Sequence, residues 1–513
     1  MYQLVLLFFG IMMISCKSQS PEQDQDPPNI IFILTDDQGW THSSHRADPN
    51  VPLTKSDFYE TPNMDELASL GVTFVNGYAP NPICSPTRHS VMLGQNAARH
   101  IYNQDVNWYK KGAERLTIPK ALKNANKNYI SAHFGKWHIA IDPTQAGFDQ
   151  HDGLTSNSHG NVFNKELLGA REYAESTKQL LDKLQAENPA SVTLAGKPST
   201  YWNDDNPKDI FGLTQKAESF MKSSIEAGRP FYVQISHYAT HLGLSAREDT
   251  YQYFKEKQPG ERHANPEFAA MLKDLDTSVG EIMNFVEELG IADNTYIFLM
   301  GDNGGRLSLN QIAIIDENKT LVSAKYSEEG HRNLPLRDGK HSFYEGGLRV
   351  PFLAMGPGIQ ANRMSDVRVT GLDLLPTFAS LADRDFVIGP TLDGGSLLPL
   401  LEDAKVTEVK RNREALIFHQ AAHRKPRSAI IKGDYKLVKY WIEETKYENT
   451  PKVELFNIKE DLGESYDMAS ELLETTSELE TELTEFLKEV NAETAKVDID
   501  DPFDRLVKEL EGE

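Results

Sequence analysis

Asn29-Ile30-Ile31-Phe32-Ile33-Leu34 is a short, largely apolar run that ends just before the acidic pair Asp36-Asp37. Short apolar runs of this kind are typical of strands that are buried on both faces of a parallel sheet. Four more such runs occur along the chain, at Tyr129–Ala132, Phe231–Ile235, Thr295–Met300 and Val350–Met355. The first run and its successors therefore predict the central strands of one large sheet.

Helical stretches separate these runs. Thr61-Pro62 begins one that ends at Gly71, and Asn265-Pro266 begins a longer one that ends at Gly290. Proline in the first turn and glycine just past the end are ordinary helix boundaries. The alternation predicts an α/β fold with a large, mostly parallel, doubly wound sheet flanked by helices. In such sheets ligands bind beyond the carboxyl ends of the strands.

Polar clusters stand at those strand ends. They follow four of the five runs, as Asp36-Asp37, Lys136-Trp137-His138, His237 with His241, and Asp302-Asn303. The two acidic clusters offer only oxygen donors, which hard divalent cations prefer. A structural reading stays open for each cluster, because strand-end loops are often polar through solvation alone and Asp302-Asn303-Gly304-Gly305 has the composition of a tight turn.

Cys84 is the only one of the two cysteines that lies outside the N-terminal leader. A lone thiol forms no internal disulfide, so its role is packing, nucleophilic chemistry or modification. If Cys84 begins a helix, Pro86 falls in the first turn and Arg88 lies one turn further on the same face. The free backbone donors of that helix start would suit an anion.

The run Cys84-Ser85-Pro86-Thr87-Arg88 resembles the signature of type I, formylglycine-dependent sulfatases of the alkaline phosphatase superfamily. In that family an enzyme oxidises the cysteine to formylglycine before the domain folds. Longer blocks carry the same resemblance, namely Gly135-Lys136-Trp137-His138, Leu336–Pro351, Gly147-Phe148-Asp149, Asp373–Phe378, Ile431–Val438 and Glu454–Glu464. They resemble bacterial carbohydrate sulfatases and arylsulfatases.

The resemblance implies a catalytic set and a metal site. The implied catalytic residues are Cys84, Arg88, Lys136, His138, His241 and Lys340. The implied ligands of one calcium ion are Asp36, Asp37, Asp302, Asn303 and the modified Cys84. In the implied reaction a formylglycine gem-diol attacks the sulfur of a sulfate ester and forms a sulfo-enzyme intermediate, which then releases sulfate. His237 remains a competitor for the role of His241.

Two departures from the family pattern concern the loops that choose a substrate. Thr41-His42 replaces the usual Gly-Asp, and the loop from Arg306 to Arg332 is longer than expected. Side chains in such loops are more often surface groups than ligands. The candidates for sugar contacts are His42, His100, His159, His237, Arg306 and His331.

The N-terminus predicts export. Residues 1–15 read as a lipoprotein signal peptide cleaved before Cys16, which would carry the lipid, and residues 16–28 as a flexible tether. A plain secretory signal stays open because Met1-Tyr2-Gln3 contains no Lys or Arg. Both readings place the protein outside the cytoplasm, in the periplasm or on the outer-membrane surface. Residues 29–400 are predicted as the catalytic domain, and 401–513 as a smaller C-terminal α+β subdomain with an antiparallel sheet.

Charge limits the partners. The chain of 513 residues carries a net charge of −23, which repels nucleic acid and anionic membranes. The predicted partners are a sulfated carbohydrate and the formylglycine-generating enzyme, with membrane contact only through a lipid anchor. The sequence thus predicts a carbohydrate sulfatase. The alternatives are a phosphate or phosphonate ester hydrolase of the same superfamily and a catalytically dead glycan-binding lipoprotein.

Overall fold

The computed structural model describes residues 26–104, 114–161, 200–307, 332–421, 426–441 and 453–494 continuously, with short stretches within 172–195 and 309–324. The predicted signal peptide, the lipidated Cys16, most of the tether and the candidate His331 lie outside the described residues.

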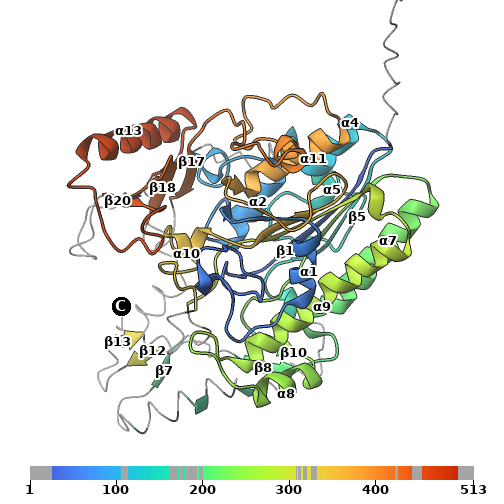
Figure 1. Ribbon diagram of the computed structural model, residues 1–513, viewed down its shortest axis with the longest axis horizontal. Coiled ribbons are helices and arrows are strands. Elements are labelled where there is room, and N and C mark those ends of the chain that lie inside the picture. The colour runs from blue at the N-terminus through green and yellow to red at the C-terminus, as the bar shows by residue number, and fades with distance from the viewer. Residues whose placement is uncertain are drawn as a thin grey trace, which may run out of the picture.

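A mixed sheet of eight strands runs through the centre of the molecule (Figure 1). Its order is β15-β2-β14-β11-β1-β9-β4-β5. The strands are β1 (Asn29–Thr35), β2 (Val72–Phe74), β4 (Ile130–Gly135), β5 (Gln150–His151), β9 (Phe231–Ser236), β11 (Thr295–Gly301), β14 (Phe352–Met355) and β15 (Arg363–Ser365). The five strands from β11 to β5 are parallel, and β14 runs antiparallel to β11 and β2.

This arrangement confirms the predicted α/β fold with a mostly parallel sheet. All five apolar runs form strands of this sheet. The run Val350–Met355 differs from the others in direction, because its strand β14 is antiparallel to β11. Its carboxyl end therefore lies at the opposite edge from the polar clusters, which explains why no such cluster follows it.

Helices cover both faces of the sheet (Figure 1). One layer contains α1 (Pro62–Leu70), α7 (Ile210–Glu226), α8 (Glu248–Glu256) and α9 (Pro266–Glu288). The other contains α2 (Cys84–Leu93), α4 (Ile118–Ala125), α11 (Leu374–Ala382) and α12 (Leu398–Glu402). The predicted helices from Pro62 to Gly71 and from Pro266 to Gly290 are confirmed as α1 and α9.

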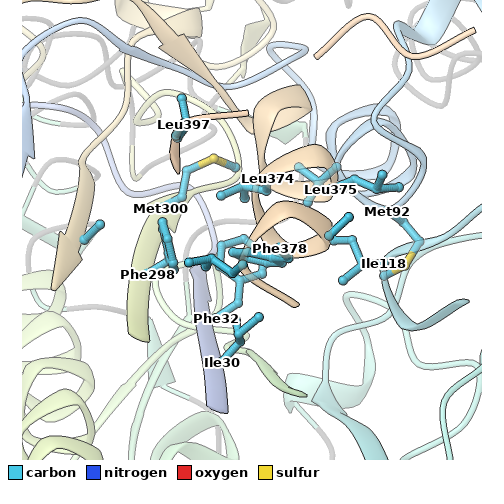
Figure 2. Packing of buried hydrophobic residues seen from close by; sticks show 14 of the residues in the cluster. Ile30, Phe32, Met92, Ile118, Phe298, Met300, Leu374, Leu375, Phe378 and Leu397 are labelled. Carbon is cyan, nitrogen blue, oxygen red and sulfur yellow. The ribbon is translucent and has the colours of Figure 1, made fainter. Parts of the chain in front are cut away.

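Strand β1 shows why the fold has two cores. Ile31 and Ile33 pack into the core beneath α9, whereas Ile30, Phe32 and Leu34 pack into the core beneath α11. Alternate side chains of a strand point to opposite faces, so a continuous apolar run supplies both cores. Figure 2 shows Phe378 of α11 against Phe32 and Phe298, with ring centroids 6.2 Å and 5.1 Å away.

Smaller elements border this core. The short strands are β3 (Gly77–Tyr78), β6 (Glu172–Tyr173), β7 (Thr193–Ala195), β8 (Thr200–Asn203), β10 (Leu244–Ala246), β12 (Ala313–Ile315), β13 (Leu321–Ala324) and β16 (Val369–Thr370). The short helices are α5 (Pro143–Ala146) and α10 (Glu345–Leu348). Single 3-10 turns lie at Pro52–Thr54, Ala97–Arg99, His159–Asn161, Pro207–Asp209, Ala292–Asn294 and Gly371–Asp373.

The C-terminal part forms the predicted antiparallel sheet. It consists of β17 (Leu416–Gln420), β18 (Arg427–Lys432), β19 (Tyr435–Tyr440) and β20 (Val453–Asn457), paired in chain order. Helix α13 (Leu473–Glu489) covers one face of this sheet, and α10 lies beside it (Figure 1). None of the described helices is long and apolar enough to cross a membrane.

Candidate active site

An acidic cluster lies at the carboxyl ends of β1 and β11. These strands are parallel neighbours with Thr35 opposite Gly301, so the residues that follow them meet. Carboxylate oxygens of Asp36, Asp37 and Asp302 lie within 4.8 Å of one another, and all three side chains are buried. The backbone N–H of Asp37 donates to Asp302 Oδ1 at 3.1 Å.

Three buried oxygens of this cluster point to a cation. Asp36 Oδ1, Asp37 Oδ2 and Asn303 Oδ1 have no hydrogen-bond partner within the described parts of the chain. A buried acceptor without a partner costs about 1–3 kcal/mol, so several in one place demand compensation. Carboxylate and amide oxygens are the ligands that a hard divalent cation takes. The residues present therefore fit the metal that the sequence predicted.

Helix α2 places the thiol and the guanidinium at this cluster. It begins at Cys84, which meets the condition set in the sequence analysis, and Cys84 Sγ lies 3.5 Å from His138 Nδ1. One turn later Arg88 donates from Nε and Nη2 to Asp302 Oδ2, at 3.0 Å and 2.8 Å. Its Nη1 donates to the carbonyl of Lys136 at 2.6 Å. Arg88 thus joins three segments of the site.

The loop after β4 brings in Lys136 and His138. It starts at Gly135, where φ is +97° and an added Cβ would lie 2.1 Å from the carbonyl oxygen of Ser236, so only glycine fits. Lys136 Nζ lies 2.5 Å from Asp36 Oδ2, and neither side chain has exposed surface. Burial, with the charges of Lys136 and Arg88, lowers the pKa of His138 to about 4.

The loop after β9 holds His241. Thr240 fastens this loop to the carbonyl of Asp36, by its N–H at 2.6 Å and its hydroxyl at 3.0 Å. His241 is half-buried, and burial together with nearby Lys340 lowers its pKa to about 3. Its charge, when present, acts on Asp36 and Asp37, which places the imidazole beside the acidic pair.

Lys340 reaches the cluster from the Gly-rich segment before α10. Its Nζ lies 2.5 Å from Asp37 Oδ1. Burial alone would lower the pKa of Lys340, but the carboxylate of Asp37 raises it, so the side chain stays charged. Lys136 and Lys340 therefore flank the acidic pair from two sides.

The carboxyl groups of Asp36 and Asp302 differ in pKa. Burial and the neighbouring Asp36 raise the pKa of Asp302 to about 7, although Arg88 opposes this. Burial would also raise that of Asp36, but Lys136 and His241 bring its pKa down to about 2. A cation held by these oxygens would favour the ionised form of Asp302.

The predicted sugar contacts are scattered. His42, His100 and His237 are buried, with exposed fractions of 0%, 0% and 1%, and a sugar contact by these three stays a prediction. His237 Nε2 lies 3.5 Å from the hydroxyl of Ser278 of α9. Of the two competing histidines, His241 is therefore the one that is partly exposed and lies beside the acidic pair. The sequence pattern around these histidines does not show their burial, because burial depends on segments that are distant in sequence.

Arg306 and His159 remain candidates. Arg306 is half-buried, and its charge lowers the pKa of both Asp37 and Lys340, so it lies near these side chains. His159 is exposed. Asn333 and Thr240 support the site but were not predicted. No sequence motif marks Asn333. Thr240 directly precedes the predicted His241 in the sequence, so that neighbour could have led to it.

Family models match most of the chain. The model described as Sulfatase matches residues 28–384, and the model described as N-sulphoglucosamine sulphohydrolase, C-terminal, matches residues 338–493. Among curated relatives, a sulfatase of Formosa agariphila is 26% identical over 524 residues, covering 91% of this chain and 89% of that protein. N-acetylgalactosamine-6-sulfatase of Homo sapiens is 29% identical over 399 residues, covering 74% of this chain and 67% of that protein.

A solved structure shares the fold. The crystal structure of Ps i-CgsB in complex with k-i-k-neocarrahexaose matches with a TM-score of 0.65 and 24% identity, covering 95% of this chain and 98% of the other. The family models, the assembled cluster and the Cys84 helix agree. The chain belongs to the sulfatase family, whose members are sulfuric ester hydrolases.

Proposed function

We propose that this protein is a calcium-dependent sulfatase that removes sulfate from a carbohydrate, with Cys84 converted to formylglycine. One observation carries the proposal: the Cys84 end of α2 lies beside a buried acidic cluster in which three oxygens have no hydrogen-bond partner among the described residues. Relatives that act on N-acetylgalactosamine 6-sulfate by name support a sulfated sugar as substrate.

Calcium fits the donor set. Asp36, Asp37, Asp302 and Asn303 supply only oxygens, as Ca²⁺ prefers, and they would hold the ion together with an oxygen on residue 84. When bound, the ion would draw negative charge from the sulfate oxygens and from the attacking hydroxyl. The hydrated aldehyde of formylglycine would supply that hydroxyl, which a thiol cannot.

The remaining residues bind the substrate anion and move protons. Lys136 and Lys340 form ion pairs with Asp36 and Asp37 and would each donate to a sulfate oxygen. His138, 3.5 Å from Cys84 Sγ and neutral at pH 7, can take a proton from a hydroxyl on residue 84. His241 would protonate the departing sugar oxygen, because a bound anion raises the pKa of an imidazole.

A paired assay tests the reaction class. The purified protein is given 4-nitrophenyl sulfate and 4-nitrophenyl phosphate under the same conditions with Ca²⁺. We expect a clear preference for the sulfate ester in kcat/KM. Preference for the phosphate ester would favour the alternative, a phosphate or phosphonate ester hydrolase. Binding of sulfated glycans without turnover by fully converted protein would favour a glycan-binding protein.

Mass spectrometry tests the modification. The peptide that contains Cys84, taken from the producing cell, should show the mass loss of a thiol converted to an aldehyde. An unmodified thiol in native, active protein would remove this mechanism.

The same material tests export, because cleavage before Cys16 with lipid on that residue would support an anchor in the periplasm or on the outer-membrane surface.

A further inference from the structure

Three loops of the active site come into close contact, and each contributes a glycine to that contact. Gly39 follows the Asp36-Asp37 pair, Gly305 follows Asp302-Asn303, and Gly339 precedes Lys340. A Cβ on any of the three would collide with its surroundings, with closest contacts of 2.9 Å, 2.2 Å and 2.3 Å. The backbones of the loops that carry the cation ligands and Lys340 are therefore in close contact here.

His42 and Asn333 are the side chains that lie at this contact. The closest atoms to a Cβ on Gly39 and Gly305 belong to His42 and Asn333, and Asn333 Nδ2 is 2.6 Å from a Cβ on Gly339. Their exposed fractions are 0% and 2%. The pair is therefore buried among the loops that carry Gly39, Gly305 and Gly339.

Hydrogen bonds from this pair reach all three loops. His42 Nδ1 accepts from the N–H of Gly39 at 3.1 Å. Asn333 Nδ2 donates to the carbonyls of Gly305 at 2.8 Å and Asp338 at 3.0 Å. Lys340 is held in addition by its own N–H, which donates to Gly305 at 3.0 Å. Asn333 thus joins the Gly305 and Asp338 segments by hydrogen bonds, whereas His42, which is in the same loop as Gly39, meets Gly305 by packing.

The two side chains also lie next to each other, against Gly305. Since Nδ1 of the neutral His42 accepts, its Nε2 carries the proton. Both amide hydrogens of Asn333 are engaged with carbonyls, so its Oδ1 is free to accept. His42 Nε2 and Asn333 Oδ1 lie 2.9 Å and 2.8 Å from the same point, the Cβ position of Gly305. Neither atom has a hydrogen-bond partner among the described residues, so the two side chains meet by packing rather than by a hydrogen bond.

We infer that His42 and Asn333 are positioning residues, which hold the cation ligands of two strand ends and Lys340 at the separation that the site requires. Their side-chain hydrogen bonds within the described residues go to the backbone of Gly39, Gly305 and Asp338, so they act through these backbones. The inference deepens the proposed function and depends on it for turnover, whereas its effect on cation binding is independent of the reaction catalysed.

The test is the calcium affinity of variants, measured by isothermal calorimetry with Ca²⁺ alone. His42→Asn keeps an acceptor for Gly39 but cannot reach Asn333, and Asn333→Asp turns a donor to two carbonyls into an anion. We expect the Kd for Ca²⁺ to rise at least tenfold in each. The double variant should lose less than the product of the two, because the pair acts as a unit.

A matched control separates this effect from simple loss of a buried histidine. His419 is also fully buried, and its ring nitrogens contact Ser428 Oγ and the carbonyl of Glu493, both at 2.7 Å, in the C-terminal sheet. His419→Asn should leave the Kd for Ca²⁺ within twofold of wild type. At saturating Ca²⁺, His42→Asn and Asn333→Asp should lower kcat more than they raise KM.

Wild-type affinity in folded His42→Asn and Asn333→Asp would overturn the inference. If these variants do not fold, hydrogen exchange of the wild-type protein decides. The amide of Gly39 and the amide of Lys340 should gain protection together when Ca²⁺ binds. Exchange of the two amides that is independent of Ca²⁺ would equally overturn it. A protein that binds Ca²⁺ as expected but releases no sulfate would contradict the proposed function and leave this inference intact.

Discussion

Arg88 makes three hydrogen bonds in the active site, and all three come from its guanidinium group. Its Nε and Nη2 both reach Asp302 Oδ2, while Nη1 reaches the carbonyl of Lys136. Arg88→Lys keeps the charge but cannot make this planar set of bonds. We expect the free energy of unfolding to fall by about 3 kcal/mol, because Asp302 loses a buried partner, and kcat to fall at least a hundredfold.

The control is Arg99→Lys, whose guanidinium contacts Asp393 at 2.9 Å and is partly exposed. This change should cost less than about 1 kcal/mol and leave kcat unchanged. Denaturant unfolding and turnover of a sulfate ester measure both effects. Equal behaviour of the two lysine variants would show that Arg88 does not organise the cluster.

The sequence predicted which kinds of residue form the site, but it did not predict the burial and the hydrogen bonds of the side chains around them. The oxygen donors Asp36, Asp37, Asp302 and Asn303 follow from the strand ends, and Cys84 with Arg88 follows from the helix spacing. The burial of His42 and the contacts of Asn333 were not predictable, since both depend on loops that are distant in sequence. Sequence periodicity reports which face of an element is buried and is silent about side chains in such loops.

Strand β4 depends on a single glycine at its end. Gly135 has a φ of +97°, and an added Cβ would lie 2.1 Å from the carbonyl of Ser236 on β9. Gly135→Ala should lower the free energy of unfolding by about 3 kcal/mol and displace Lys136. Gly228→Ala is the control, because φ there is +63° with nothing within 4 Å, so only about 1 kcal/mol of backbone strain is expected.

Thermal or denaturant unfolding of the two alanine variants, with their kcat values, checks this prediction. If Gly135→Ala is as stable and active as Gly228→Ala, β4 does not require glycine at its end.

At the scale of helices and strands, the sequence predicted most of the elements that build the site. Helices α1, α2 and α9 begin where proline or the Cys84 motif indicated. The reversed direction of β14 was not predictable, because strand direction depends on chain connections rather than on composition.

Whole-molecule stability depends on a buried ion network between the two parts. Lys436 of β19 contacts Glu345 of α10 at 2.9 Å and Glu464 at 2.8 Å, and all three side chains are fully buried. Lys436→Met leaves two buried carboxylates without their cation, so we expect a loss of about 3–5 kcal/mol in the free energy of unfolding.

Lys439→Met, on the same strand, is the control. Lys439 contacts Glu480 at 2.8 Å on the partly exposed face, so its loss should cost less than about 1 kcal/mol. Denaturant unfolding compares the two variants. A similar, small effect of both would mean that the buried network does not hold the C-terminal sheet to the catalytic part.

Buried histidines make the whole fold sensitive to acid. Burial lowers the pKa of His419 to about 4 in the folded state, against about 6.5 when unfolded. Between these values the unfolded chain binds more protons, so stability is retained above pH 6.5 and is lost as the pH falls towards 4. Each such histidine contributes a slope of about 1.4 kcal/mol per pH unit in that window.

His419→Asn removes one of these terms. Its deficit in unfolding free energy relative to wild type should shrink by about 2 kcal/mol between pH 7 and pH 5. Urea unfolding at the two pH values measures the change. A deficit that stays constant or grows as the pH falls would show that His419 is already protonated in the folded protein.

Release of inorganic sulfate tests the central claim most directly. The native protein is incubated with a panel of sulfated oligosaccharides, and free sulfate is measured by ion chromatography before and after treatment with a calcium chelator. We predict sulfate release from at least one sugar, its loss on chelation and its return with added Ca²⁺. Release that is indifferent to chelation, or no release by protein with converted Cys84 and bound Ca²⁺, would contradict the account.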